Sequence, residues 1–116
     1  MPSVLRGNDD FDTLGSKGLG DGQVWTDVLA SRASAVEYTN TSGRAIQVIV
    51  SVQGKVAGNT FLSLVVDGII VNEEQSGANT DGSIKGSVQA IVPNGSIYEL
   101  QLTGGAQSIE EWAELR

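Results

Sequence analysis

The segment from Phe61 to Glu74, FLSLVVDGIIVNEE, decides the fold because it contains a hairpin that can be positioned from sequence alone. Asp67-Gly68 separates two apolar runs, and both residues tolerate the positive φ that the central positions of a type I′ turn require. Such a turn sets the register of the two flanking strands. The expected cross-strand pairs are Val66 with Ile69, Val65 with Ile70, Leu64 with Val71, and Leu62 with Glu73.

The two faces of this hairpin differ in polarity, because successive side chains of a strand point to opposite faces. One face is aliphatic and is expected to face a core. Its residues are Leu62, Leu64, Val66, Ile69 and Val71. The other face is half apolar, and it carries Phe61, Ser63, Val65, Ile70, Asn72 and Glu74. A half-apolar outer face predicts that a partner covers it.

Similar alternation, bounded by turn residues, recurs along the chain. Strands are predicted over residues 23–28, 36–40, 45–53, 61–66, 69–74, 83–92 and 96–103. Short strands with hairpin-length connections are typical of an all-β fold, here an antiparallel β-sandwich of jelly-roll type. Residues 1–17 are expected to form an irregular lead-in, and residues 18–116 a single β-sandwich domain. The predicted core residues are Ile46, Val48, Val50, Leu62, Leu64, Val66, Val88, Val92, Leu100 and Leu102.

The last segment, SIEEWAEL over residues 108–115, fits two structures. Ile109, Trp112 and Leu115 follow a helical spacing, and Ser108 with Glu111 resembles a capping box. The same residues also alternate as a strand would. We favour the strand, because a β-sandwich needs a closing strand at this position.

Composition excludes several classes of function. The chain has neither Cys nor His, so disulfides, thiolate metal sites and histidine-based catalysis are absent. The net charge is −7 and the seven Lys and Arg residues are scattered, which predicts no nucleic-acid partner. No apolar run approaches the roughly 20 residues of a membrane-spanning helix, so membrane insertion is not expected. The N-terminal residues lack the apolar core of a signal peptide, which is compatible with synthesis in the cytoplasm.

The carboxylates do not form a pattern that predicts catalysis. Glu73-Glu74 and Glu110-Glu111 are sequence neighbours, and neighbours in strands point to opposite faces, whereas a catalytic carboxylate pair must converge. The acidic residues 8–12 lack the ligand spacing of a calcium loop. We therefore predict a non-enzymatic protein without a metal site or cofactor.

If the domain binds glycans, polar loops are expected to do much of the binding, and residues 58–60 and 77–81 are the natural places. The candidate receptor-binding residues, chosen because loops on rigid scaffolds carry recognition, are Gln75, Asn79, Thr80 and Asp81. An equally weighted alternative is that these loops only connect strands. A sugar platform would need an exposed aromatic side chain, but the four candidates lie within strand patterns that favour core or interface packing. These four are Trp25, Tyr38, Tyr98 and Trp112.

An oligomer interface is expected where apolar side chains lie outside the predicted core, because monomers rarely expose large apolar patches. The candidate interface residues are Ile49, Phe61, Val65 and Ile70. Arg32 and Arg44 are expected to pair with acidic residues across this interface, where such pairs set register more than stability. The candidate acidic partners are Asp27, Glu37 and Glu99.

The order of motifs resembles the C-terminal tip domains of tailed-phage tail fibres and related virion spikes. The resemblance rests on GLGDGQVWTDV, SRASAVEYTNTSGRAIQVIVSV, VDG, AIVPNGSIYEL and IEEWAELR. The matching residues, which span nearly all of residues 18–116, are Gly20, Gln23, Trp25, Arg32, Tyr38, Thr39-Asn40-Thr41, Gly43-Arg44, Val66-Asp67-Gly68, Val92-Pro93, Gly95, Tyr98, Trp112, Glu114 and Leu115.

The resemblance implies a homotrimeric β-sandwich knob at the distal end of a virion fibre. The implied function is host-surface recognition and fibre trimerisation, with a host cell-surface glycan or protein and other virion tail proteins as partners. An alternative is a structural virion protein, such as a decoration or cap on a capsid or tail, without a receptor-binding role. Residues 1–17 are too short for a fibre shaft, so we expect an excised tip domain or a small virion protein.

Overall fold

The computed structural model describes residues 18–54, 60–76, 85–104 and 107–116. The predicted lead-in over residues 1–17 lies outside these ranges. The elements are β1 (Trp25–Asp27), a 3₁₀ turn η1 (Leu29–Ser31), β2 (Tyr38–Thr39), β3 (Ile46–Gly54), β4 (Thr60–Val66), β5 (Ile69–Ser76), β6 (Lys85–Val92), β7 (Ile97–Thr103) and β8 (Gln107–Leu115). The first two predicted strands are therefore real but shorter than expected.

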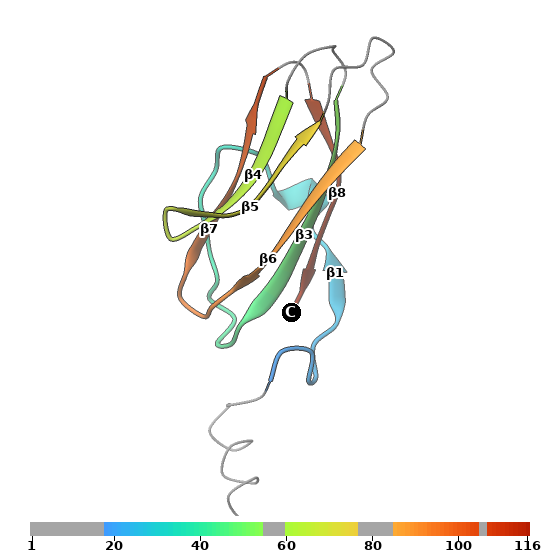
Figure 1. The fold of residues 1–116 in the computed structure, drawn as a ribbon. Coiled ribbons are helices and arrows are strands. Elements are labelled where there is room, and N and C mark those ends of the chain that lie inside the picture. Colours follow the sequence, from blue (N-terminus) through green and yellow to red (C-terminus); the bar gives the residue numbers. More distant parts are fainter. Residues whose placement is uncertain (1–17, 55–59, 77–84, 105–106) are drawn as a thin grey trace, which may run out of the picture.

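The strands form two four-stranded antiparallel sheets that pack as two layers (Figure 1). Sheet A has the order β1-β8-β3-β6, and sheet B has the order β2-β7-β4-β5. This interleaved order, in which the first and last strands are neighbours in one sheet, is that of a jelly roll. The predicted all-β sandwich is confirmed, and so is the strand assignment of the last segment.

The core lies between the two sheets and consists mainly of the predicted residues. Its buried apolar side chains are Ile46, Val48, Val50, Val52, Leu62, Leu64, Val66, Val88, Val92, Tyr98, Leu100 and Trp112. Leu102 is only partly buried against this cluster. The alternation along β3, β4, β6 and β7 thus identified the inward faces correctly, because the side-chain period of a strand is two.

The hairpin between β4 and β5 confirms the predicted turn but not the whole register. Asp67 and Gly68 have φ values of 51° and 81°, as a type I′ turn requires. The pairs Val66–Ile69 and Val65–Ile70 form as expected, but a register shift follows, so that Leu64 pairs with Asn72 and Leu62 with Glu74. The predicted pairs Leu64–Val71 and Leu62–Glu73 are therefore wrong, because a bulge at Val71 displaces the rest of β5 by one residue.

The bulge also changes which residues of β5 reach the core. Ile69 and Val71, predicted on the core face, are 64% and 48% exposed. Ile69 flanks a turn that projects sideways from the sandwich (Figure 1), and Val71 is the extra residue of the bulge. Asn72 and Glu74 take the positions opposite Leu64 and Leu62 on the inner face, where Asn72 is partly buried and Glu74 stays exposed at the edge.

These inward polar residues connect the two sheets along one open edge. The Nδ2 of Asn72 donates a hydrogen bond to the Gln89 carbonyl at 3.0 Å. The backbone N–H of Ser87 donates to Oε2 of Glu74 at 3.3 Å. Since β5 and β6 are edge strands of opposite sheets, the side chains of β5 occupy backbone groups of β6 that would otherwise be open to another strand.

Candidate functional site

The most buried charged group of the described residues is the carboxylate of Glu114 on β8, which has no solvent exposure. Its Oε1 accepts hydrogen bonds from Nη2 of Arg32 at 3.0 Å and Nε of Arg116 at 2.7 Å. Its Oε2 accepts from Nε of Arg32 at 3.1 Å, the Tyr98 hydroxyl at 2.8 Å and Nε1 of Trp112 at 3.1 Å. Glu114 thus receives five hydrogen bonds from four side chains, which come from three segments distant in sequence.

The charges in this cluster stabilise one another against the cost of burial. Burial alone would raise the pKa of Glu114, but hydrogen bonds from Arg32, Tyr98 and Arg116 outweigh it and hold this pKa below its usual range. Burial and the neighbouring Glu114 carboxylate raise the pKa of the Tyr98 hydroxyl. At neutral pH the cluster therefore contains an ionised Glu114 and a protonated Tyr98.

Aromatic rings surround the ion pair. The Arg32 guanidinium carbon lies 4.6 Å from the centroid of the Tyr38 ring, within the range of a cation–π contact. The Tyr38 ring in turn packs against Tyr98 and, edge to face, against Trp112, at centroid distances of 5.9 and 6.1 Å. The Tyr38 hydroxyl accepts a hydrogen bond from the backbone N–H of Ala33 at 2.8 Å, which fixes the chain before β2 against this cluster.

The geometry of the cluster makes it a structural clamp. A carboxylate offers about four lone-pair positions, and the five donors already present leave none for a substrate. The clamp joins β8 and β7 to the segment before β2, so that both sheets are held by one group. The expected pairing of Arg32 across a subunit interface is wrong, because Arg32 pairs with Glu114 of its own chain.

A second clamp is built around Asn40, which is fully buried after β2. Its Nδ2 donates to the carbonyls of Val92 and Arg44 at 3.0 and 2.8 Å, and its Oδ1 accepts from the Ser42 hydroxyl at 2.7 Å. Gly43 in the same turn has φ of 91°, where a side chain would be strained. The turns predicted near residues 43 and 95 thus meet at one buried amide.

The hairpin turn is attached to β7 by a third polar contact. Oδ2 of Asp67 accepts from the Ser96 hydroxyl at 2.7 Å, and Oδ1 accepts from the Ile97 N–H at 2.9 Å. These bonds lower the pKa of Asp67. Asp67 therefore serves the fold twice, since it adopts the positive φ of the turn and also anchors that turn.

Of the four predicted receptor-binding residues, the structure describes only Gln75. Gln75 lies exposed on β5. Asn79, Thr80 and Asp81 lie outside the described residues, so their assignment stays a prediction.

The predicted interface residues lie on two different surfaces. Phe61, Val65 and Ile70 belong to sheet B, on the face turned away from the core, whereas Ile49 lies on the outer face of sheet A. The idea of one continuous patch is therefore wrong, because β3 and β4 pair in different sheets. Ile70 is 54% exposed, but Val65 is only 9% exposed, so Ile70 is the more accessible contact for another subunit.

One of the four aromatic candidates, Trp25, lies outside the core. Trp25 is 50% exposed, and it pairs with Leu115 at the edge of sheet A. Leu115 lies on the outer face, because the preceding Glu114 points inward, and Trp25 shares that face. One signal was present in the sequence: the same side of the predicted strand carries Asp27, and a charged companion indicates an outward-facing position.

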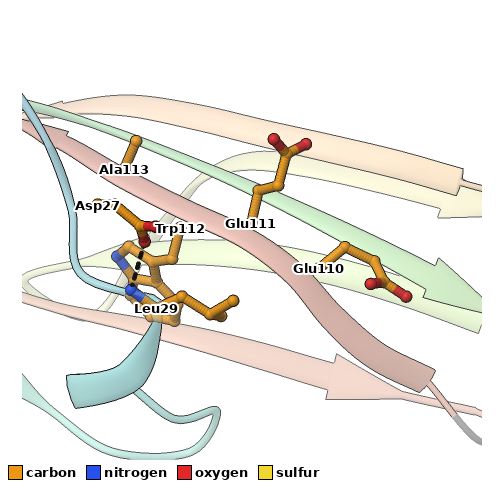
Figure 2. Close-up of a pocket in the computed structure, with 6 residues that line it drawn as sticks. All are labelled: Asp27, Leu29, Glu110, Glu111, Trp112 and Ala113. Carbon is orange, nitrogen blue, oxygen red and sulfur yellow. Dashed lines mark hydrogen bonds between the residues drawn. The ribbon is translucent and has the colours of Figure 1, made fainter.

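A shallow cleft lies beside this edge, where β1 ends after three residues and leaves β8 partly uncovered. Its lining residues are Asp27, Leu29, Glu110, Glu111, Trp112 and Ala113 (Figure 2). Ala113 and Glu111 point to one side of β8, away from Trp112 (Figure 2). Oδ1 of Asp27 accepts the Leu29 N–H at 3.0 Å, which orders the start of η1.

The described residues contain no group of three or more His, Cys, Asp or Glu side chains placed to hold a metal ion. Within the same ranges, no helix is long and apolar enough to cross a membrane.

Comparison with known proteins gives structural likenesses only. No family model matches the chain, and no curated protein matches it. Dimeric latent PorU from Porphyromonas gingivalis is 12% identical with a TM-score of 0.49, over 78% of this chain and 10% of that protein. The carbohydrate-binding module CBM36, solved with calcium and xylotriose, is 17% identical with a TM-score of 0.44, over 80% and 88% of the two chains. The chain thus spans about a tenth of the length of PorU.

Proposed function

We propose that this protein is a non-enzymatic tip or spike domain of a tailed-phage virion fibre, which recognises the host surface and forms a homotrimer. Its location is the virion, and its partners are a host cell-surface molecule and other virion tail proteins. The proposal starts from the sequence resemblance to fibre tip domains.

The proposal is supported by the positions of the matching residues in the structure. Arg32, Tyr38, Tyr98, Trp112 and Glu114 come from segments up to 82 residues apart, as the Arg32–Glu114 hydrogen bond illustrates, yet they form a single buried cluster. Others build the clamps of Asn40 and Asp67 described above. Residues that depend on one another in three dimensions form a more specific signature than separate short motifs, which supports a shared domain architecture.

The same observation distinguishes residues that stabilise the fold from residues that are available to contact a host. Because the motif residues in these clusters serve packing, the surface that meets a host must consist of residues outside the clusters. The outer faces of the sheets are available for this in a single chain, and they carry several exposed apolar side chains. These are Trp25 and Ile91 on sheet A, and Ile70 and Ile97 on sheet B. Outer faces with such residues suit contacts with other molecules.

The proposal is tested by adsorption. Fluorescently labelled protein is incubated with a panel of bacterial strains, and cell-bound fluorescence is measured by flow cytometry, with light scattering reporting the mass of the same preparation. We expect saturable binding to a subset of strains by a trimer. A trimer that binds no strain would contradict host recognition and would favour the alternative of a structural decoration or cap.

A further inference from the structure

We propose that the outer face of sheet A around Trp25 binds a neutral oligosaccharide. This inference rests on the proposed host-recognition function and assigns to it a surface and a ligand class. The site combines an exposed aromatic platform, a pair of amide side chains and a negatively charged border.

The strand register places the platform in a row of side chains that crosses the whole sheet. Leu115 pairs with both Trp25 and Gln47, and Gln47 pairs with Ile91 on the other edge. Directly opposite residues of antiparallel strands lie on the same face. At spacings of about 4.8 Å between strands, this row is roughly 15 Å long, which is enough for several sugar rings.

The ends of the row are its most accessible parts. Trp25 and Ile91 are 50% and 49% exposed, whereas Gln47 and Leu115 between them are half-buried. No side chain among the described residues accepts a hydrogen bond from the Trp25 indole. The indole ring therefore offers an apolar surface and a free N–H donor within these ranges, a combination suited to a ligand with both C–H and O–H groups.

Polar groups lie in the next row of the same face. Gln89 pairs with Ile49, and its Oε1 accepts a hydrogen bond from Nε2 of Gln47 at 2.9 Å. This amide pair is pre-ordered: the Gln47 carbonyl oxygen and the Gln89 amino group remain available for ligand hydroxyls. Ordered polar groups beside an aromatic platform lower the entropy cost of binding.

Charge selects among possible ligands. Asp27 and Glu111 lie on this face and border the cleft, and Lys85 lies at the opposite end of β6, roughly 20 Å from Ile91 along the strand. The carboxylates can accept hydrogen bonds from sugar hydroxyls but repel phosphate and carboxylate groups. The site therefore favours neutral oligosaccharides over anionic ones.

In an oligomer that packs through sheet B, the arrangement of the sandwich would leave this face free. Ile70 lies on the outer face of sheet B, on the other side of the core from Trp25. Subunits that pack through sheet B would leave sheet A facing outward. A mixed surface, in which Gln47 and Asp27 separate the apolar residues, also fits a soluble ligand better than a permanent subunit contact, whose centre is depleted of charge.

The test uses the intact protein and a glycan array that contains neutral and anionic oligosaccharides. We expect binding to one or more neutral oligosaccharides, and Trp25→Ala should weaken that binding by at least about tenfold, equivalent to 1.4 kcal/mol. Trp25→Phe, which keeps a ring, should lose less. Val24→Ala is the matched control, because Val24 is 69% exposed but points to the opposite side of β1.

Fluorescence quenching gives an independent readout. Trp25 is half exposed and Trp112 is 1% exposed, so acrylamide should quench mainly Trp25. A saturating oligosaccharide should protect Trp25 from quenching, and Trp25→Phe should remove this protected component while leaving the Trp112 emission unchanged.

Each outcome decides the proposal. Unchanged glycan binding by Trp25→Ala, or binding only to anionic oligosaccharides, would overturn it. So would a parent protein that adsorbs to bacterial cells but binds no glycan, although that result would leave the proposed host-recognition function standing. A parent protein that neither binds glycans nor adsorbs to any strain would contradict both.

Discussion

The Glu114 side chain joins residues that lie far apart in the sequence. Its carboxylate is buried, yet five hydrogen bonds from Arg32, Arg116, Tyr98 and Trp112 saturate it. Removing one partner of a buried ion pair is far more costly than the pair is stabilising, because the remaining charge stays buried and uncompensated.

Glu114→Gln should therefore destabilise the fold strongly. The amide keeps the shape of the side chain but removes the negative charge and places an amino group against donors of Arg32 and Trp112. We expect a loss of about 3–5 kcal/mol in the free energy of unfolding, measured by urea denaturation. The control is Glu110→Gln on the exposed side of the same strand. A loss no larger than that of the control would show that the ion pair does not hold the sheets together.

Acid should weaken the same clamp. Because the pKa of Glu114 is lower in the folded state than in the unfolded state, its contribution is complete above the ordinary glutamate pKa of about 4.3. That contribution disappears as the pH falls through the lower folded-state pKa. Thermal unfolding between pH 7 and pH 2 should show this decline in the parent. The decline should be shallower in Glu114→Gln, and equal slopes would assign the acid sensitivity to other carboxylates.

Sequence reasoning identified the individual core residues but not their polar partners. The alternation of Ile46, Val48 and Val50 is local, so it identifies an inward face without knowledge of the topology. The contact between Arg32 and Glu114 depends on how distant strands pair, and no local period encodes that. For Trp25 the alternation left core and interface packing open, and its 50% exposure excludes only the core.

At the scale of elements, the bulge in β5 has the largest effect. Asp67-Gly68 determines the turn, and the register follows for two pairs, but one extra residue at Val71 reverses the faces beyond it. The shift brings Asn72 and Glu74 inward, where they bind the backbone of β6. A local pattern could not predict this bulge. In an unbroken register Val71 lies on the aliphatic face, and an apolar residue there gives no sign of a bulge.

Gly86 on β6 allows the edge strands β5 and β6 to approach each other closely. A Cβ atom at this position would lie 3.0 Å from Cδ2 of Leu62 and 3.2 Å from Oε1 of Glu74. Leu62 is buried in the core and has little room to move. Gly86→Ala should therefore lower the free energy of unfolding by about 1–3 kcal/mol through overpacking, measured by denaturant unfolding.

Ser87→Ala is the matched control for this prediction, since Ser87 is the next residue of β6 and points outward. It should be nearly neutral. If Gly86→Ala has the same effect as Ser87→Ala, or stabilises the fold, the edge between β5 and β6 is looser than the structure indicates.

At the scale of the whole molecule, the two outer faces are expected to have different roles. We propose that sheet B contacts other subunits and that sheet A contacts the host. The separation follows from the topology, which places Ile49 and Ile70 on opposite sides of the core although the sequence suggested a common patch.

Ile70→Glu tests the subunit contact without disturbing a single chain, because Ile70 is 54% exposed there. In a trimer that packs through sheet B, three carboxylates would be buried at one interface, which is costly. We expect light scattering to give a trimer for the parent and a monomer for this variant. Ile91→Glu, at a similarly exposed site on sheet A, should remain trimeric. A monomeric parent, or dissociation caused only by Ile91→Glu, would show that the subunit contact does not lie on sheet B.

The location of recognition is tested most directly by mapping amide and indole chemical shifts of the ¹⁵N-labelled protein during titration with a neutral surface polysaccharide from an adsorbing strain. We expect shifts of the Trp25 indole N–H and of Gln47, Gln89 and Ala113, with little change in β4 and β5. Shifts confined to Asn79, Thr80 and Asp81 would instead support recognition by the polar loop. Those loop-confined shifts, or no shifts at all, would contradict recognition by the outer face of sheet A.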